Sequence, residues 1–347
     1  MELDVDTFLV TVYCVVDDLY RAELAPLLAG RPGARGKLSD SEVLALAALA
    51  QWEAHRCERC FLAYARAHWL AYFPGLTSQS AFNRRARNLW AALCRLGPAI
   101  ARAVDRLLGG PPAYEVWDGL PVPLMRRCRG GRHRTFAAEA GFGRGGSDRE
   151  MYYGMHMLAA AGAGGAISGF VVGPADTSEY WLAEALLRWR RDPAAPPPTA
   201  AELAPALGPC HRAGGERLGP TGPLGPRWGA GRPAEGPYLS DLGCAGRHWR
   251  DHWRAAYGAT VLTKADYAAI GPQAERQGWT AWLCGLRQQA ETVFNALTDL
   301  LGAKFPRARS TWGVWTRLAA KVAAFNLAVY VNHLFGRNPF ALFNPML

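Results

Sequence analysis

The pattern of predicted elements changes at Pro111, and this change constrains the fold of the 347-residue chain more than any other feature. Residues 1–110 are expected to be helical, and Ser39 and Glu42 form a predicted capping box at the start of one helix. After Pro111, short apolar runs with β character alternate with helical patterns. The sequence therefore predicts an all-helical region followed by a mixed α/β unit.

The α/β unit is expected to begin with a strand at 114–117 that ends at Asp118, followed by a hairpin built from residues 152–159 and 167–172. The later elements are expected as helices at 179–189, 245–256 and 281–301 and as strands at 238–240 and 260–263. This order is that of an RNase H-like domain, a mixed sheet flanked by helices, which we assign to residues 111–310. A last amphipathic helix over 314–334, with Arg317 and Lys321 on its polar side, lies in a C-terminal unit, 311–347.

Residues 192–237 interrupt this order with an unusual composition. They contain 11 Pro and 9 Gly among 46 residues, which predicts a long insertion loop rather than a packed element. The loop is either a lineage-specific insertion or a DNA contact, and its candidate contacts are Arg212, Arg217, Arg227 and Arg232.

Three acids are the candidate chemical groups of the α/β unit. Asp118 and Asp241 follow predicted strands, and Glu291 lies on the late helix. Three carboxylates in one cleft repel each other unless a cation compensates, and oxygen ligands suit Mg²⁺ or Mn²⁺. Two such ions would activate an attacking oxygen and stabilise a leaving one. The spacing therefore predicts a two-Mg²⁺ site, in which Mn²⁺ can substitute, although acids at strand ends are also common in ordinary folds.

Positive charge is concentrated toward the end of the chain. The net charge is +10, and residues 261–347 hold 9 basic and 4 acidic side chains, with no acid beyond Asp299. Predicted DNA contacts in this part are Arg287, one helical turn before Glu291, and Lys304, Arg307 and Arg309. An i,i+4 ion pair with Glu291 is the alternative for Arg287, and a solvated surface is the alternative for the others.

Two further basic clusters are candidates for phosphate contacts. Arg126 and Arg127 open an acid-free run, and a predicted helix over 81–93 carries Asn83, Arg84, Arg85 and Arg87 near its start. A short basic helix after a turn is typical of a helix-turn-helix reader. An ordinary helical bundle with an Arg-rich outer face accounts for the same pattern.

The chain is expected to be cytoplasmic, because its acidic N-terminus lacks the basic start of a signal peptide. The uncharged stretch 151–173 is expected to be a hairpin rather than a membrane span.

Cys57 and Cys60 form a CxxC pair, but without a second pair we expect reduced thiols and not structural zinc. Cys244, His248 and His252 share one face of a predicted helix, where packing is favoured over zinc binding.

Several short motifs, taken together, resemble one family. They are Ser39–Leu44, Ser78–Arg85, Asp118–Pro123, Met151–Gly154, Gly173–Asp176, Glu291–Phe294 and Arg307–Ser310. Over nearly its whole length the chain resembles the bacterial insertion-sequence DDE transposases, closest to insertion-sequence family 982. It departs from the family's Asp-Ser-x-Pro-Val-Pro pattern at Gly119, and from its Gly-Asp-Lys-Gly-Tyr pattern at Leu242, where a cation is missing beside Asp241.

The resemblance implies a transposase that binds the ends of its own insertion sequence. Asp118, Asp241 and Glu291 would be the catalytic and metal-binding acids of hydrolysis at the element's end and of 3′-hydroxyl attack on target DNA. The implied partner is double-stranded DNA, bound by a homodimer, with no membrane involved. A catalytically silent DNA-binding derivative and an RNase H-like nuclease without strand transfer are the alternatives.

Overall fold

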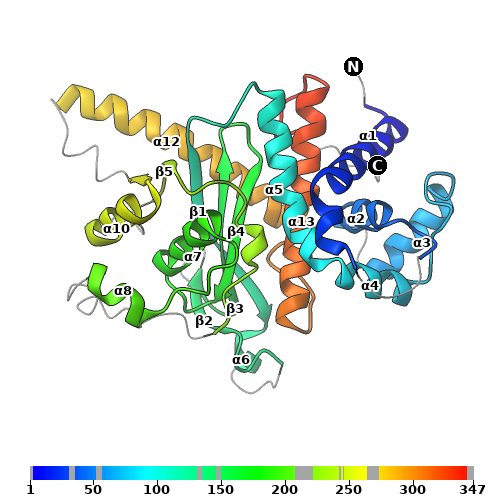
Figure 1. Cartoon of the computed structure of the whole chain (residues 1–347), viewed down its shortest axis with the longest axis horizontal. Coiled ribbons are helices and arrows are strands. Elements are labelled where there is room, and N and C mark those ends of the chain that lie inside the picture. The colour runs from blue at the N-terminus through cyan, green and yellow to red at the C-terminus, as the bar shows by residue number, and fades with distance from the viewer. Residues whose placement is uncertain are drawn as a thin grey trace.

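The computed structural model describes residues 3–30, 36–51, 57–130, 135–145, 150–207, 222–241, 244, 246–263 and 273–341. Figure 1 shows a mixed α/β arrangement in which helices flank both faces of a curled sheet and an all-helical region lies to one side. The predicted α/β class is therefore confirmed. Among the described helices, none is long and apolar enough to cross a membrane.

The first part of the chain is helical, as predicted. Its main helices are α1 (Val5–Leu19), α2 (Asp40–Leu49), α3 (Glu58–His68), α4 (Gln79–Asn88) and α5 (Trp90–Leu107), and short turns at Tyr20–Leu24 and Ala25–Leu28 follow α1. The capping box at the start of α2 is present, because Ser39 and Glu42 exchange both of its hydrogen bonds. The single helix expected over 81–93 is instead two helices, since α4 ends at Asn88 and α5 begins at Trp90.

In the described part of the chain, six strands form one sheet. They are β1 (Glu115–Met125), β2 (Gly141–Gly145), β3 (Glu150–Gly162), β4 (Ile167–Pro174), β5 (Gly236–Leu239) and β6 (Ala259–Leu262). β3 pairs antiparallel with β1 on one edge and with β2 and β4 on the other. β5 and β6 extend the sheet beyond β1 as parallel strands. The predicted hairpin is therefore confirmed as β3 and β4.

The expected end of the first strand at Asp118 is wrong, because β1 continues to Met125 and Asp118 lies inside it. Pro121 and Pro123 suggested an end, since proline cannot donate a hydrogen bond to a strand neighbour. The register resolves this point. β5 pairs with Glu115 and Val116 of β1, so among the described strands the later part of β1 has a partner on one edge alone. Proline is tolerated at such an edge.

The remaining helices are α6 (Arg127–Gly130), α7 (Glu179–Arg191), α8 (Ala200–Leu207), α10 (Arg247–Tyr257), α12 (Gln273–Asn295) with a last turn at Ala296–Leu300, and α13 (Thr311–Leu334). Helices α7 and α10 pack on one face of the sheet and α13 packs with α5 on the other, whereas α6 lies beyond one end (Figure 1). Successive strand residues point to opposite faces. Val116 therefore packs in the core shared with α5 and α13, whereas Trp117 packs in the core shared with α7 and α10.

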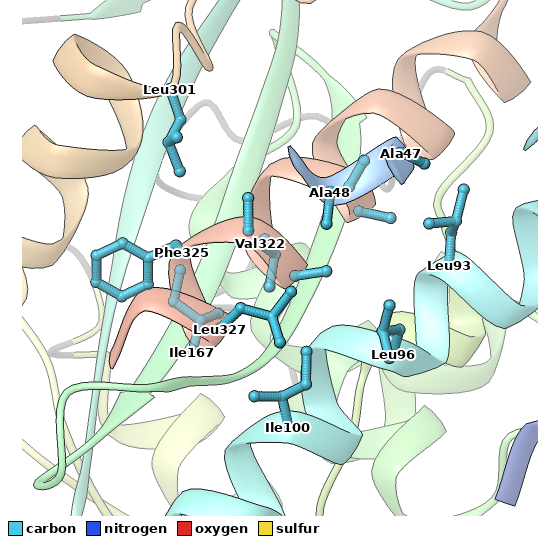
Figure 2. Packing of buried hydrophobic residues seen from close by; sticks show 14 of the residues in the cluster. Ala47, Ala48, Leu93, Leu96, Ile100, Ile167, Leu301, Val322, Phe325 and Leu327 are labelled. Atoms are coloured by element: carbon cyan, nitrogen blue, oxygen red, sulfur yellow. The ribbon is translucent and has the colours of Figure 1, made fainter. Parts of the chain in front are cut away.

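Helix α13 is not the amphipathic surface helix expected from the sequence. Lys321 is buried, and its ammonium donates to the carbonyl of Leu301. The buried Asn326 side chain bonds the backbone of Ile167 in β4 and the carbonyl of Gly97 in α5. Figure 2 shows the apolar side chains that α13 packs among. The helix is rich in alanine, and small side chains on several sides let neighbouring elements approach closely.

The expectation that 192–237 is an unpacked loop is wrong for the parts that the structure describes, 192–207 and 222–237. Residues 200–207 form α8, whose Leu203 and Leu207 are buried. Trp228 packs edge-on against Trp90 of α5, with ring centroids 4.7 Å apart. The high proline and glycine content obscured these apolar anchors. Arg212 and Arg217 lie outside the described residues.

Arg232 is not a DNA contact of the kind that the sequence suggested. Its guanidinium is buried and lies 2.5 Å from Asp105 and 3.1 Å from Glu115. A buried, paired guanidinium holds the fold together and offers no face to a phosphate.

Candidate active site

The parallel register of β1 and β5 places two of the predicted acids side by side. Glu115 is level with Tyr238 and Val116 with Leu239. Continuing the same spacing brings Asp118 level with Asp241, which follows the end of β5 by two residues. Two positions 123 residues apart in the sequence thus meet at the same point of the sheet.

The third predicted acid approaches from helix α12. Glu291 and Arg287 both lie on this helix, one turn apart, and the charges of both act on the carboxyl of Asp118. Glu291 is exposed, whereas Asp118 is largely buried. The structure therefore brings the three sequence-predicted acids into one electrostatic neighbourhood, with Arg287 as the cation beside them.

A fourth acid, Glu179, belongs to the same neighbourhood and was not singled out from the sequence. It opens α7, and the charges of Asp118 and Asp241 act on its carboxyl. Acids are ordinary at the first turn of a helix, where they complement its dipole, so the sequence offered no signal for a further role. We call Asp118, Glu179, Asp241 and Glu291 the carboxylate cluster.

His156 lies beside Glu179 on strand β3. Its Nδ1 donates to the carbonyl of Thr177 at 3.1 Å, and its Nε2 lies 3.9 Å from Oε1 of Glu179. Burial lowers the pKa of the imidazole. The histidine is therefore both a hydrogen-bonded sheet residue and a neighbour of the carboxylate cluster.

Gly119 provides the space in which these side chains meet. A Cβ atom at this position would lie 2.5 Å from Oε1 of Glu179 and 2.5 Å from Nε2 of His156. A residue with a side chain at this position would therefore displace at least one of these two side chains.

The carboxylate cluster is electrostatically unbalanced. Burial, followed by the charges of Asp241 and Glu291, raises the pKa of Asp118 to about 6 against the partial relief from the Gly119 amide and Arg287. Burial, followed by the charges of Asp241 and Asp118, raises the pKa of Glu179 to about 7. Buried acids with raised pKa values are costly to ionise unless something positive binds to them.

The acids are oxygen donors of the kind that Mg²⁺ and Mn²⁺ prefer. In the described part of the chain, however, no group of three or more His, Cys, Asp or Glu side chains is already arranged to hold a metal ion. The donor chemistry therefore fits a divalent cation, but the described side chains are not gathered closely enough to coordinate one. The same result holds for Cys244, His248 and His252, since His252 instead bonds the buried Glu184 at 3.0 Å.

A second site lies between the helical region and the start of α13. Its cavity, of about 470 Å³, is lined by Asn83 and Arg87 of α4 and by Arg307, Arg309 and Arg317. We call it the basic pocket. Four of the ten predicted DNA-binding residues line it, and they come from segments more than 200 positions apart in the sequence.

Polar groups also converge on the basic pocket. Its acid, Glu58, accepts hydrogen bonds from the amides of Gln79 at 2.7 Å and Asn83 at 3.1 Å, and Arg317 lies 4.0 Å away. Ser310 caps α13 here, so the positive end of a 24-residue helix faces the same region. The pocket thus has more positive than negative charge.

The other predicted DNA contacts are placed differently. Arg85 is half-buried and pairs with Asp40 at 2.5 Å, so it ties α4 to the start of α2. Arg84 and Lys304 are exposed. Arg126 and Arg127 are exposed at α6, which projects beyond one end of the sheet (Figure 1). The structure brings none of these into the basic pocket.

No family model matches the chain, and neither a curated protein nor a solved structure matches it.

Proposed function

We propose that the chain is a DNA transposase that cleaves the ends of its own insertion sequence and joins them to target DNA. The observation that carries this proposal is the carboxylate cluster, in which the charges of Asp241, after β5, and of Glu291, on α12, act on Asp118 of β1 together with one arginine. The sheet order supports an RNase H-like fold. In this order an antiparallel meander, β1 with β3 and β4, is extended by parallel β5 and β6.

Asp118, Asp241 and Glu291 would hold the divalent ions. Bound there, Mg²⁺ or Mn²⁺ would supply positive charge to the attacking and leaving oxygens of a phosphodiester. The raised pKa of Asp118 supports this assignment, because an acid whose charged form is destabilised by burial and by neighbouring acids gains most from a bound cation.

The chain's own residues have separate roles around this chemistry. We assign Arg287 to the scissile phosphate, since it is the cation whose charge acts on both Asp118 and Glu179. His156 and Glu179 lie against Gly119 of β1 and would fill the space beside Asp118. The exposed position of Glu291 leaves room for a strand of DNA to approach.

The basic pocket would grip the DNA backbone away from the reacting phosphate. Guanidinium groups pair with phosphate through two hydrogen bonds, and a helix start adds backbone amides. The convergence of α4 with the segment before α13 supports this role, because both segments were candidates for DNA binding on sequence alone.

The test is a strand-transfer assay with labelled duplexes that carry the terminal repeats flanking the gene, in Mg²⁺. The proposal expects both nicked ends and joined product from the wild-type chain. Asp118→Asn should yield neither, whereas Asp251→Asn, the same change at an exposed residue of α10, should behave as wild type. Cleavage without joining would indicate a nuclease. Binding without cleavage would indicate a silent derivative, and either result would overturn the proposal.

A further inference from the structure

Two cysteines at the start of α3 lie outside the sites described so far. Cys57 and Cys60 are both exposed, and their sulfur atoms are 2.9 Å apart. This separation is closer than two unbonded sulfur atoms normally approach. The pair is therefore positioned either to share a proton or to form a covalent bond.

The two thiols differ in their surroundings. Cys57 is the N-cap of α3, with an extended backbone, and the amide of Cys60 donates to its sulfur at 3.3 Å. A thiolate is stabilised at this end of a helix. Its contact with Cys60 lowers the pKa of Cys57, and the same contact raises the pKa of Cys60. Cys57 is thus the better nucleophile, and the Cys60 sulfur is close enough to attack a disulfide formed at Cys57.

The other cysteines of the described residues offer internal comparisons. Cys94 and Cys244 are buried, and burial raises the pKa of each thiol. Cys14, Cys128 and Cys284 are exposed, but none has another cysteine three residues away. Exposure alone is therefore shared by several thiols, whereas exposure with a neighbouring sulfur distinguishes Cys57 and Cys60 from them.

We propose that Cys57 and Cys60 are a reversible dithiol–disulfide site that exchanges with small-molecule disulfides. The Cys57 thiolate attacks one sulfur of the small disulfide, forms a mixed disulfide and releases one small thiol. The Cys60 thiol then loses its proton to water and attacks the Cys57 sulfur, which releases the second small thiol. The protein loses two electrons and two protons, and one small disulfide becomes two thiols.

This site lies at the rim of the basic pocket. Glu58 follows Cys57 directly, lines the pocket and accepts hydrogen bonds from Gln79 and Asn83 of α4. A disulfide would fix the first turn of α3 at the point where it contacts α4. The inference itself rests on thiol geometry and is independent of the proposed function.

The experiment treats the reduced full-length protein with oxidised glutathione, then blocks free thiols with iodoacetamide and maps the peptides by mass spectrometry. The expected result is a peptide in which Cys57 and Cys60 are both unalkylated and two hydrogens lighter, formed at least about tenfold faster than any adduct at Cys128 or Cys284. Dithiothreitol should reverse it.

Two variants assign the roles. Cys60→Ser should accumulate a stable glutathione adduct at Cys57, because no second thiol resolves it. Cys57→Ser should leave Cys60 as slow as the exposed single thiols. A wild-type protein in which both cysteines stay alkylatable, or in which Cys57 keeps its glutathione adduct, would overturn the inference. Equal reactivity of the two single variants would overturn the assignment of Cys57 as the attacking thiol.

Discussion

Two acids on the same strand, Glu115 and Asp118, show opposite electrostatic arrangements. Glu115 is buried between two guanidinium groups, with Arg190 at 2.5 Å and Arg232 at 3.1 Å, and Arg190 also contacts the hydroxyl groups of Tyr238 and Ser168. Three residues further along β1, Asp118 has acids around it and one arginine nearby.

The difference indicates what each acid is for. A buried charge that serves the fold is paired and hydrogen-bonded, because an unpaired one would destabilise the protein by several kcal/mol. At Asp118, by contrast, burial and the charges of Asp241 and Glu291 raise the pKa to about 6, against the Gly119 amide and Arg287. An acid whose charged form is destabilised in this way is a candidate to bind a cation.

The largest expected effect is the loss of DNA cleavage when Asp118 is replaced. Asp118→Asn should reduce end cleavage by about 1,000-fold or more in the strand-transfer assay. The loss of one member of a catalytic unit removes about as much activity as the loss of the whole unit. Binding of the labelled ends, measured by gel shift, should stay within about twofold of wild type. Cleavage within tenfold of wild type would remove Asp118 from the site.

The next effect concerns the paired acid. Arg190→Ala should lower the free energy of unfolding by about 3–5 kcal/mol, since it leaves Glu115 buried with less compensation. Arg247→Ala is the matched control, because its pair with Asp251 is 87% and 65% exposed and should change stability by less than about 1 kcal/mol. Urea unfolding followed by circular dichroism measures both. Equal losses of unfolding free energy in the two variants would show that the buried pair stabilises the protein no more than the exposed pair.

A third expected effect is a gain in stability, where Arg190→Ala gives a loss. A carboxyl whose pKa rises from 3.8 to about 6 on folding costs up to about 3 kcal/mol once it is ionised. Without divalent ions, Asp118→Asn should therefore stabilise the protein at pH 7.5, and the gain should shrink as the pH falls through 6 and vanish near pH 4. A variant less stable than wild type at pH 7.5 would contradict the conclusion that burial and nearby acids raise the pKa of Asp118.

The smallest effect concerns the basic pocket, whose Arg307 and Arg309 are exposed, whereas Arg190 is buried. Replacing Arg307 and Arg309 by alanine should reduce the slope of log Kd against log salt by about 0.9 for each phosphate that the variant no longer neutralises. The equivalent pair Arg247 and Arg254, exposed on α10, should leave the slope unchanged. An unchanged slope in the first variant would make the pocket ordinary surface.

The sequence predicted the order of elements well where local patterns decide it. The capping box at Ser39, the β3–β4 hairpin and the helices that alternate with β5 and β6 were each visible as short-range patterns. The acids Asp118, Asp241 and Glu291 could be nominated in the same way, although their proximity depends on the pairing of β1 with β5 and on the packing of α12.

What could not be predicted depends on tertiary contacts. The sequence pattern predicts that Lys321 is a surface cation. The elements packed around α13 instead bury it against the carbonyl of Leu301. Arg232 reads as part of a loop and is a buried partner of Glu115. Glu179 became notable once β1 and α7 placed it beside Gly119. In each case the neighbour that sets the role is distant in sequence.

The most direct test of the central claim is Mn²⁺ binding to the wild-type chain, measured by calorimetry in the absence of DNA. We predict saturable binding that Asp118→Asn or Asp241→Asn weakens at least tenfold, whereas Asp251→Asn leaves it unchanged. Binding equally tight in Asp118→Asn and in wild type would contradict the claim that the carboxylate cluster is a cation site.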